Sequence, residues 1–297
     1  MTSLAATGQL QFKPKVGVFY MMAAIAVLGS TDAVVKWLST NTVPVDPIQI
    51  GFSRFVVSLI MVLWLVGSSQ PGFAALRTKR PLEHAARAFC AAIELTAFYF
   101  AISKIPLPTA MSIVATSPIF GTLLGVVFLR ERLRLGGWIA VFAGCAGMLL
   151  VVQPEEGANS VIGTIAVLTS VFLWCFAQLF ARRLSTTESN FSILFYYAIG
   201  GVIILGLATP FVWVNPTPLA WLGLLGVGLF GCLGQYFLIL ALRYAPMSLL
   251  APFEYSSLLW ASLYGYMFWG DVLGPVAIAG VAIIIVACLY ITRTMEH

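Results

Sequence analysis

The sequence is dominated by apolar runs that are each about as long as a lipid bilayer is thick. A helix needs roughly 20 apolar residues to cross the hydrocarbon core. Charged residues make up only 9% of the 297 residues, where a soluble domain has about 25%. We therefore predict an all-α polytopic membrane protein with ten transmembrane helices, near residues 16–37, 47–67, 85–103, 109–129, 135–152, 161–181, 192–212, 219–241, 248–268 and 272–292.

The pattern inside these runs favours helices over a membrane β-barrel. The runs are longer than single strands and lack strict apolar–polar alternation. The first run is too long for the core of a signal peptide, so we interpret it as the first transmembrane helix. Residues 1–15 are polar and are expected to form a cytoplasmic tail.

The basic residues predict the orientation of the chain. Of its 16 Lys and Arg, all but Lys36, Arg54 and Lys104 fall on one side of the membrane when the N-terminus is placed inside. Cytoplasmic loops are enriched in these residues. Both termini are therefore expected in the cytoplasm, which requires an even number of helices. Because the basic residues are spread over separate membrane loops, we expect no nucleic-acid partner despite the net charge of +5.

An internal repeat appears when the sequence is shifted by 140 residues. The stretch 104–133 then aligns with 244–273 without a gap, and Ser117 meets Ser257. Five predicted helices in each half is an odd number, so the second half enters the membrane upside down. We therefore predict two inverted five-helix repeats, over residues 16–152 and 161–292. This plan is common in solute carriers, because exchanging the conformations of the two halves exchanges inward and outward access.

Several short motifs in the first half resemble those of the drug/metabolite transporter superfamily, in its EamA branch. They are Ile105-Pro106-Leu107-Pro108-Thr109-Ala110, Ser117-Pro118-Ile119-Phe120, Phe128-Leu129-Arg130-Glu131-Arg132-Leu133 and Gly144-Cys145-Ala146-Gly147. The second half repeats the pattern more loosely from Ala245-Pro246 to Gly270-Asp271, so the resemblance covers nearly the whole chain.

The resemblance implies ten helices around a central cavity, in the cytoplasmic (inner) membrane of a bacterium. It implies alternating-access transport of a small organic solute. Among family members the chain is most similar to exporters of aromatic and neutral amino acids. The alternative is another metabolite, such as a nucleobase, a vitamin or a cationic drug. The expected partners are the solute and membrane lipid.

Ionisable residues inside the predicted helices are the first candidates for the site. Each costs at least about 2.5–3.5 kcal/mol at membrane depth and so needs a reason to be there. Asp32 and Lys36 share a helix face, as an internal ion pair or as a patch for a zwitterion. Glu94 and Glu254 are candidates for binding an amine or for proton coupling, or else they join helices by hydrogen bonds. Arg54 is expected either to pair with an acidic residue or to reach the interface.

Aromatic, amide and proline residues complete the list of candidates. Trp174 and Gln178 lie four residues apart and combine an apolar plate with an amide, which suits a planar solute. Tyr99, Gln235 and Tyr255 are further candidates for substrate binding, against the simpler interpretation that they only pack. Pro118 and Pro252 each free a backbone carbonyl and are candidate hinges or kinks.

Enzymes and channels fit the sequence less well. The histidines, His84 and His297, lie at or beyond helix ends, and no HExxH, GxSxG or Walker A motif is present. The five cysteines lie singly in apolar runs, where we interpret them as packing residues. We therefore predict no catalytic residue, metal or cofactor. A channel is less favoured because no filter motif is visible.

Overall fold

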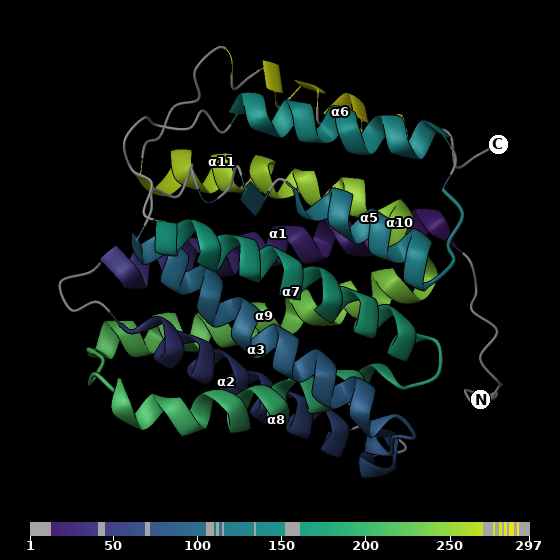
Figure 1. Cartoon of the computed structure of the whole chain (residues 1–297). Helices are drawn as coiled ribbons and strands as arrows, with labels where there is room; N and C mark the ends of the chain where they lie inside the picture. The colour runs from purple at the N-terminus through teal and green to yellow at the C-terminus, as the bar shows by residue number, and fades with distance from the viewer. Residues whose placement is uncertain are drawn as a thin grey trace.

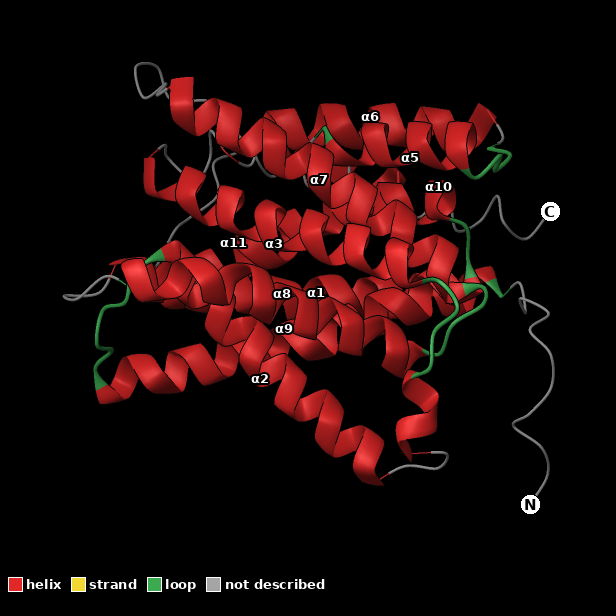
Figure 2. Ribbon diagram, turned by 60° about the horizontal axis from the view of Figure 1, so that its bottom comes forward, coloured by secondary structure: helices red, strands yellow, loops and turns green. Residues whose placement is uncertain are grey.

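The computed structural model describes residues 13–40, 45–68, 72–104, 116–133, 135–151 and 161–269, with isolated positions at 110, 113–114 and between 276 and 290. Within these ranges the chain is helical and contains no strand (Figure 2). The longer helices are α1 (Pro14–Thr40), α2 (Pro47–Ser68), α3 (Pro81–Lys104), α5 (Ser117–Phe128), α6 (Leu135–Val151), α7 (Val161–Ser185), α8 (Asn190–Ala208), α9 (Pro218–Tyr244) and α11 (Ser257–Trp269). The short elements are η1 (Gly72–Leu76), η2 (Thr209–Phe211), α10 (Met247–Leu250) and η3 (Ala251–Ser256).

Five of the described helices are long and apolar enough to cross a membrane. They are α1, α2, α7, α8 with η2, and α9. The shorter α5 and α6 are also apolar. The predicted helix at 109–129 is described from Ser117 onward, and the predicted helix at 272–292 lies almost entirely outside the described residues. The all-helical class is therefore confirmed, whereas the number of ten spans remains a prediction.

Local signals in the sequence set where the helices begin. Pro14, Pro47, Pro81 and Pro218 each open a helix, where the missing N–H of proline costs no hydrogen bond. The Thr217 side chain accepts a hydrogen bond from the backbone N–H of Ala220, at 3.2 Å, and so caps α9.

The predicted helix at 248–268 is interrupted in the structure. α10 passes into the 3₁₀ segment η3 at Ala251, and the α-helical geometry resumes at Ser257. Pro252, one of the two candidate hinges, lies near the start of η3, where it cannot donate the hydrogen bond that would continue the helix. Pro118, the other candidate, lies in the first turn of α5, where proline is tolerated.

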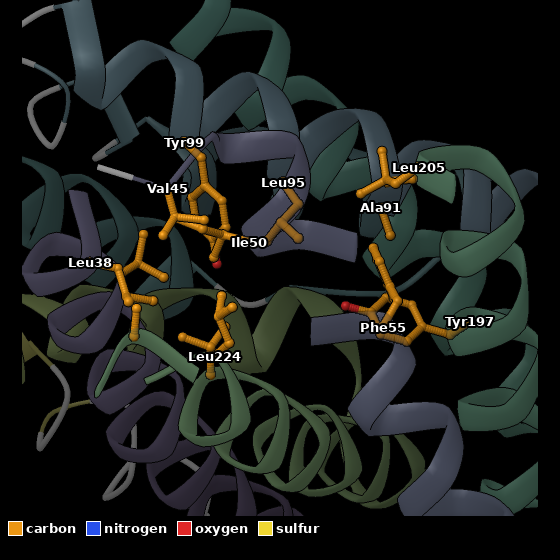
Figure 3. Packing of buried hydrophobic residues seen from close by; sticks show 14 of the residues in the cluster. Leu38, Val45, Ile50, Phe55, Ala91, Leu95, Tyr99, Tyr197, Leu205 and Leu224 are labelled. Carbon is orange, nitrogen blue, oxygen red and sulfur yellow. The ribbon is translucent and has the colours of Figure 1, made fainter. Parts of the chain in front are cut away.

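Most of the helices run in roughly the same direction across the view, with α6 near the top and α8 near the bottom, while α2 and α3 cross it obliquely (Figure 1). α1 packs along α9 and α3 along α7, while α2 contacts both α8 and α9. A buried cluster joins α1, α2, α3, α7, α8 and α9 (Figure 3). Within this cluster the rings of Phe55 and Tyr197 meet edge to face, with ring centroids 5.0 Å apart.

The outer surface of the bundle carries many large apolar side chains. Large side chains such as Phe19, Trp64 and Phe211 are 68%, 71% and 88% exposed. In water this would be an aggregation-prone surface, but in lipid it is the expected exterior.

Glycines on α9 let α2 approach closely. A Cβ atom at Gly228 would lie only 2.3 Å from the Cβ of Val57. Gly226, on another face of the same helix, has only the tip of Phe230 within 4 Å, at 3.9 Å. Close contacts through small residues are a main source of helix association in lipid.

We expect Gly228→Ala to destabilise the protein and Gly226→Ala to leave it unchanged or slightly more stable. Overpacking at residue 228 costs about 1–3 kcal/mol, whereas alanine in a helix is about 1 kcal/mol better than glycine where space allows. The measurement is the apparent Tm in detergent, read as the monodisperse fraction left after heating. Equal Tm values for the two variants would contradict this account of the α2–α9 contact.

Candidate functional site

A cavity of about 170 Å³ lies among α1, α2, α3, α5, α7, α9, η3 and the start of α11, with room for on the order of ten water molecules. Its wall is mostly apolar, with a few polar and charged side chains. Eight of the predicted residues line it: Asp32, Glu94, Tyr99, Pro118, Trp174, Gln235, Glu254 and Tyr255. These eight come from segments far apart in the sequence, so the fold gathers them in one place.

Three predicted residues do not line the cavity. Lys36 lies one turn beyond Asp32 on α1, and Gln178 lies one turn beyond Trp174 on α7, where it is only 3% exposed. The shared face proposed for Trp174 and Gln178 therefore presents only its tryptophan to the cavity. Pro252 is buried within η3.

Glu254 is held at the cavity wall by the start of α5. The Ser117 hydroxyl donates a hydrogen bond to Oε2 of Glu254, at 3.2 Å. Trp174 of α7 also lines the cavity, and its indole N–H donates a hydrogen bond to the Glu254 carboxylate. The interruption at Pro252 places Glu254 in a 3₁₀ turn rather than in a regular transmembrane helix.

Glu94 has a similar partner. The Ser170 hydroxyl of α7 donates a hydrogen bond to Oε1 of Glu94, at 3.4 Å. Each of these two carboxylates thus accepts a hydrogen bond from a neutral serine, and Glu254 also has a side-chain hydrogen bond with Trp174. Carboxylates can accept several more bonds, so each retains capacity for a ligand.

Asp32 and Arg54 add one charge of each sign to the wall. Arg54 is 5% exposed, and its Nη1 donates to the hydroxyl of Tyr99, at 3.4 Å. Its charge attracts both Asp32 and Glu94. Among the described residues no carboxylate lies within ion-pair distance of Arg54.

The list predicted from the sequence missed Arg54, Ser117 and Ser170. Arg54 carried a visible signal, an arginine within an apolar run, but it was interpreted as a structural partner rather than as part of the site. The two serines carried no comparable signal, because serine is common in transmembrane helices and is inexpensive there.

Tyr255 is a wall residue whose hydroxyl is already engaged. That hydroxyl donates to the backbone carbonyl of Val141 on α6, at 3.0 Å. The ring packs against Gly144, where a Cβ atom would lie 2.3 Å from the ring. Tyr255 therefore offers its ring, not its hydroxyl, as the surface that a ligand could meet.

A polar network centred on Glu131 joins the segment after α5 to the start of α10 and to the last turn of α7. Its two carboxylate oxygens accept hydrogen bonds from the backbone N–H groups of Met247 and Ser248, at 3.0 and 2.8 Å. Oε1 also lies 3.5 Å from Nε of Arg182, which in turn donates to the carbonyl of Leu242. We call Glu131, Arg182 and the start of α10 the Glu131 latch. Leu242 lies one helical turn beyond the cavity-lining Leu238.

No group of three or more His, Cys, Asp or Glu within the described part of the chain is arranged to hold a metal ion. The functional groups in the cavity wall are carboxylates, one guanidinium, hydroxyls and aromatic rings. These groups can bind and orient a small polar solute.

Known proteins that are similar to this chain include transporters of small molecules. A pseudopaline exporter of Pseudomonas aeruginosa is 29% identical over 95% of this chain and 98% of its own length. An S-adenosylmethionine uptake transporter of Rickettsia bellii is 26% identical over 93% of each chain. A solved crystal structure superposes with a TM-score of 0.80 at 16% identity, covering 95% of this chain and 99% of that one, and so shares the fold. The EamA-like transporter family matches twice, at residues 15–153 and 161–293, and the chain is an integral membrane protein that belongs to this family of metabolite transporters.

Proposed function

We propose that the protein is a carrier for small organic metabolites that bear a protonated amine, with neutral and aromatic amino acids as the leading class. The observation that supports this most directly is the set of three carboxylates, Asp32, Glu94 and Glu254, in the wall of a mostly apolar cavity. A protonated amine is the ligand group that such carboxylates favour. The aromatic rings of Trp174 and Tyr99 suit an apolar or aromatic side chain on the same solute.

The proposal is for a transporter rather than an enzyme or a channel. The two relatives compared above are an exporter and an uptake transporter, so proteins similar to this chain carry solutes in either direction. We propose export for this chain, across the cytoplasmic membrane of a bacterium. Glu94 and Glu254 are the proposed proton sites if transport is coupled to a pH gradient.

We further propose ten helices arranged as two inverted repeats, over 16–152 and 161–292, with both termini in the cytoplasm. The double match to one family supports two related halves. Ser117 and Ser257, which align under the shift of 140 residues, each begin a helix and each line the cavity. In this arrangement the Glu131 latch lies on the cytoplasmic side.

Alternating access then requires that the latch opens. We propose that the contacts of Glu131 with the start of α10 and with Arg182 close the path from the cavity to the cytoplasm beyond Leu238. We propose that export begins when these contacts break and a solute enters from the cytoplasm. The contacts re-form as the cavity turns outward.

Proteoliposomes of the purified protein test the proposed substrate class. We expect saturable uptake of labelled neutral and aromatic amino acids, competed by unlabelled substrate, and measured with and without a pH gradient. Glu254→Gln should raise KM about tenfold or more, because it removes a charged hydrogen-bond partner of the amine. Trp174→Ala should also weaken transport.

Glu83→Gln is a matched control for Glu254→Gln, because Glu83 lies at a helix end beside Arg80 and outside the cavity. It should transport normally. Normal kinetics in both Glu254→Gln and Trp174→Ala would contradict the assigned site. Absence of uptake by folded wild-type protein would instead contradict the amino acid assignment and direct the search to other metabolites.

Glu131→Gln should favour the state that is open to the cytoplasm. Loss of the charge weakens its hydrogen bonds by about 1.5–3 kcal/mol in total, which shifts the equilibrium about tenfold or more. The readout is labelling of Leu238→Cys, in a background without native cysteines, by an impermeant thiol reagent applied to inside-out vesicles. Faster labelling is expected with Glu131→Gln and unchanged labelling with Glu83→Gln. Equal rates in all three proteins would exclude the latch as a gate.

A further inference from the structure

The side-chain amide of Gln235 on α9 is oriented by a hydrogen bond from a residue outside the cavity wall. Its Oε1 accepts a hydrogen bond from Nη2 of Arg87, at 3.1 Å. A guanidinium has only donors, so the oxygen of the amide must be the end that faces Arg87. Because Gln235 lines the cavity, the NH₂ group is the end left to face a ligand. The cavity therefore has a neutral donor at this position.

Arg87 itself is held firmly in place. It is 2% exposed, and its Nη1 donates to the carbonyl of Ile193 on α8, at 3.2 Å. Its guanidinium carbon lies 4.7 Å from the centroid of the Tyr197 ring. Within the described residues no carboxylate pairs with Arg87. Arg87 is thus a positioning residue, since it reaches the cavity only through Gln235.

Arg54 provides a second donor one turn away. Its side chain crosses α9 at Gly231, where a Cβ atom would lie 2.5 Å from Nε of Arg54. Gly231 and Gln235 are four residues apart and so lie on the same face of α9. The Nε of Arg54 is buried and has no hydrogen-bond partner in the described structure. Nε is packed against α9 and out of reach of a ligand, so the Arg54 guanidinium can meet a carboxylate only through its two terminal nitrogens.

We propose that Arg54 and the Gln235 amide form a carboxylate-binding subsite, whose geometry Arg87 sets. The planar guanidinium and the adjacent NH₂ present several donors to the two oxygens of a carboxylate. A doubly charged phosphate is disfavoured, because Asp32, Glu94 and Glu254 line the same cavity. This inference rests on the proposed amino acid function and deepens it, since it assigns the end of the cavity that recognises the acid group.

The test compares an amino acid with its amide as competitors. Uptake of labelled L-phenylalanine into proteoliposomes gives an inhibition constant for unlabelled L-phenylalanine and another for L-phenylalaninamide. The measured ratio is the inhibition constant of L-phenylalanine divided by that of L-phenylalaninamide. This ratio should rise about tenfold or more in Gln235→Glu, because a carboxylate replaces the donor that faced the acid group of the substrate. Gln235→Glu has nearly the same shape and keeps an acceptor for Arg87, so folding should be preserved.

Gln235→Met separates loss of the donor from the effect of an added charge. It should also raise the ratio by several-fold, whereas a general effect of negative charge in the cavity would leave it unchanged. Arg87→Met, which frees the amide to turn, should shift the ratio in the same direction. Arg87→Lys retains a donor-only partner for Oε1 and should shift the ratio less. Thermal stability in detergent confirms that each variant is folded.

The outcomes separate the two proposals. If wild-type protein transports phenylalanine but Gln235→Glu and Gln235→Met leave the ratio unchanged, the subsite is wrong and the transport function stands. If wild-type protein shows no saturable uptake or binding of any amino acid, the amino acid assignment fails and the subsite fails with it.

Discussion

The structure depends on the cost of placing charge in a chain that is apolar both inside and out. Lipid offers no hydrogen bonds, so backbone polar groups must be satisfied within helices and side-chain charges must find partners or a water-filled space. In this chain the charges of Asp32, Arg54, Glu94 and Glu254 meet at one cavity. The same requirement that makes these residues expensive therefore also locates the site.

Close helix packing makes this arrangement possible. Glycines on α9 bring α2 near enough for Arg54 to pass over Gly231 and reach the cavity. Gly144 on α6 similarly makes room for the Tyr255 ring. The hydroxyl of Tyr255 donates a hydrogen bond to the carbonyl of Val141. Small residues thus do more than join helices, since they determine which polar groups of neighbouring helices can reach the cavity.

Much of the fold and of the candidate site could be predicted from the sequence, but only as positions along each helix. Length and hydropathy indicated where Glu94 and Glu254 lie in depth, and both line the cavity. The direction in which each side chain points around its helix axis was harder to predict. Gln178 shares a helix face with Trp174 yet stays buried against other helices. Arg87 was counted only as a cytoplasmic charge. Its contact with Gln235 joins residues 148 positions apart, and no local pattern predicts such a contact.

The irregular segment from α10 to η3 connects the two ends of the proposed transport cycle. Its first residues, Met247 and Ser248, bind Glu131 of the latch, and Glu254 lies six residues beyond Ser248, in the cavity wall. A regular helix would transmit a shift at one end mainly as a rigid-body motion. The 3₁₀ turn at Pro252 lacks one intrahelical hydrogen bond and so deforms more readily. A solute that draws Glu254 away from Ser117 would therefore act directly on the segment that the latch holds, which provides a short physical route between occupancy of the cavity and opening of the gate.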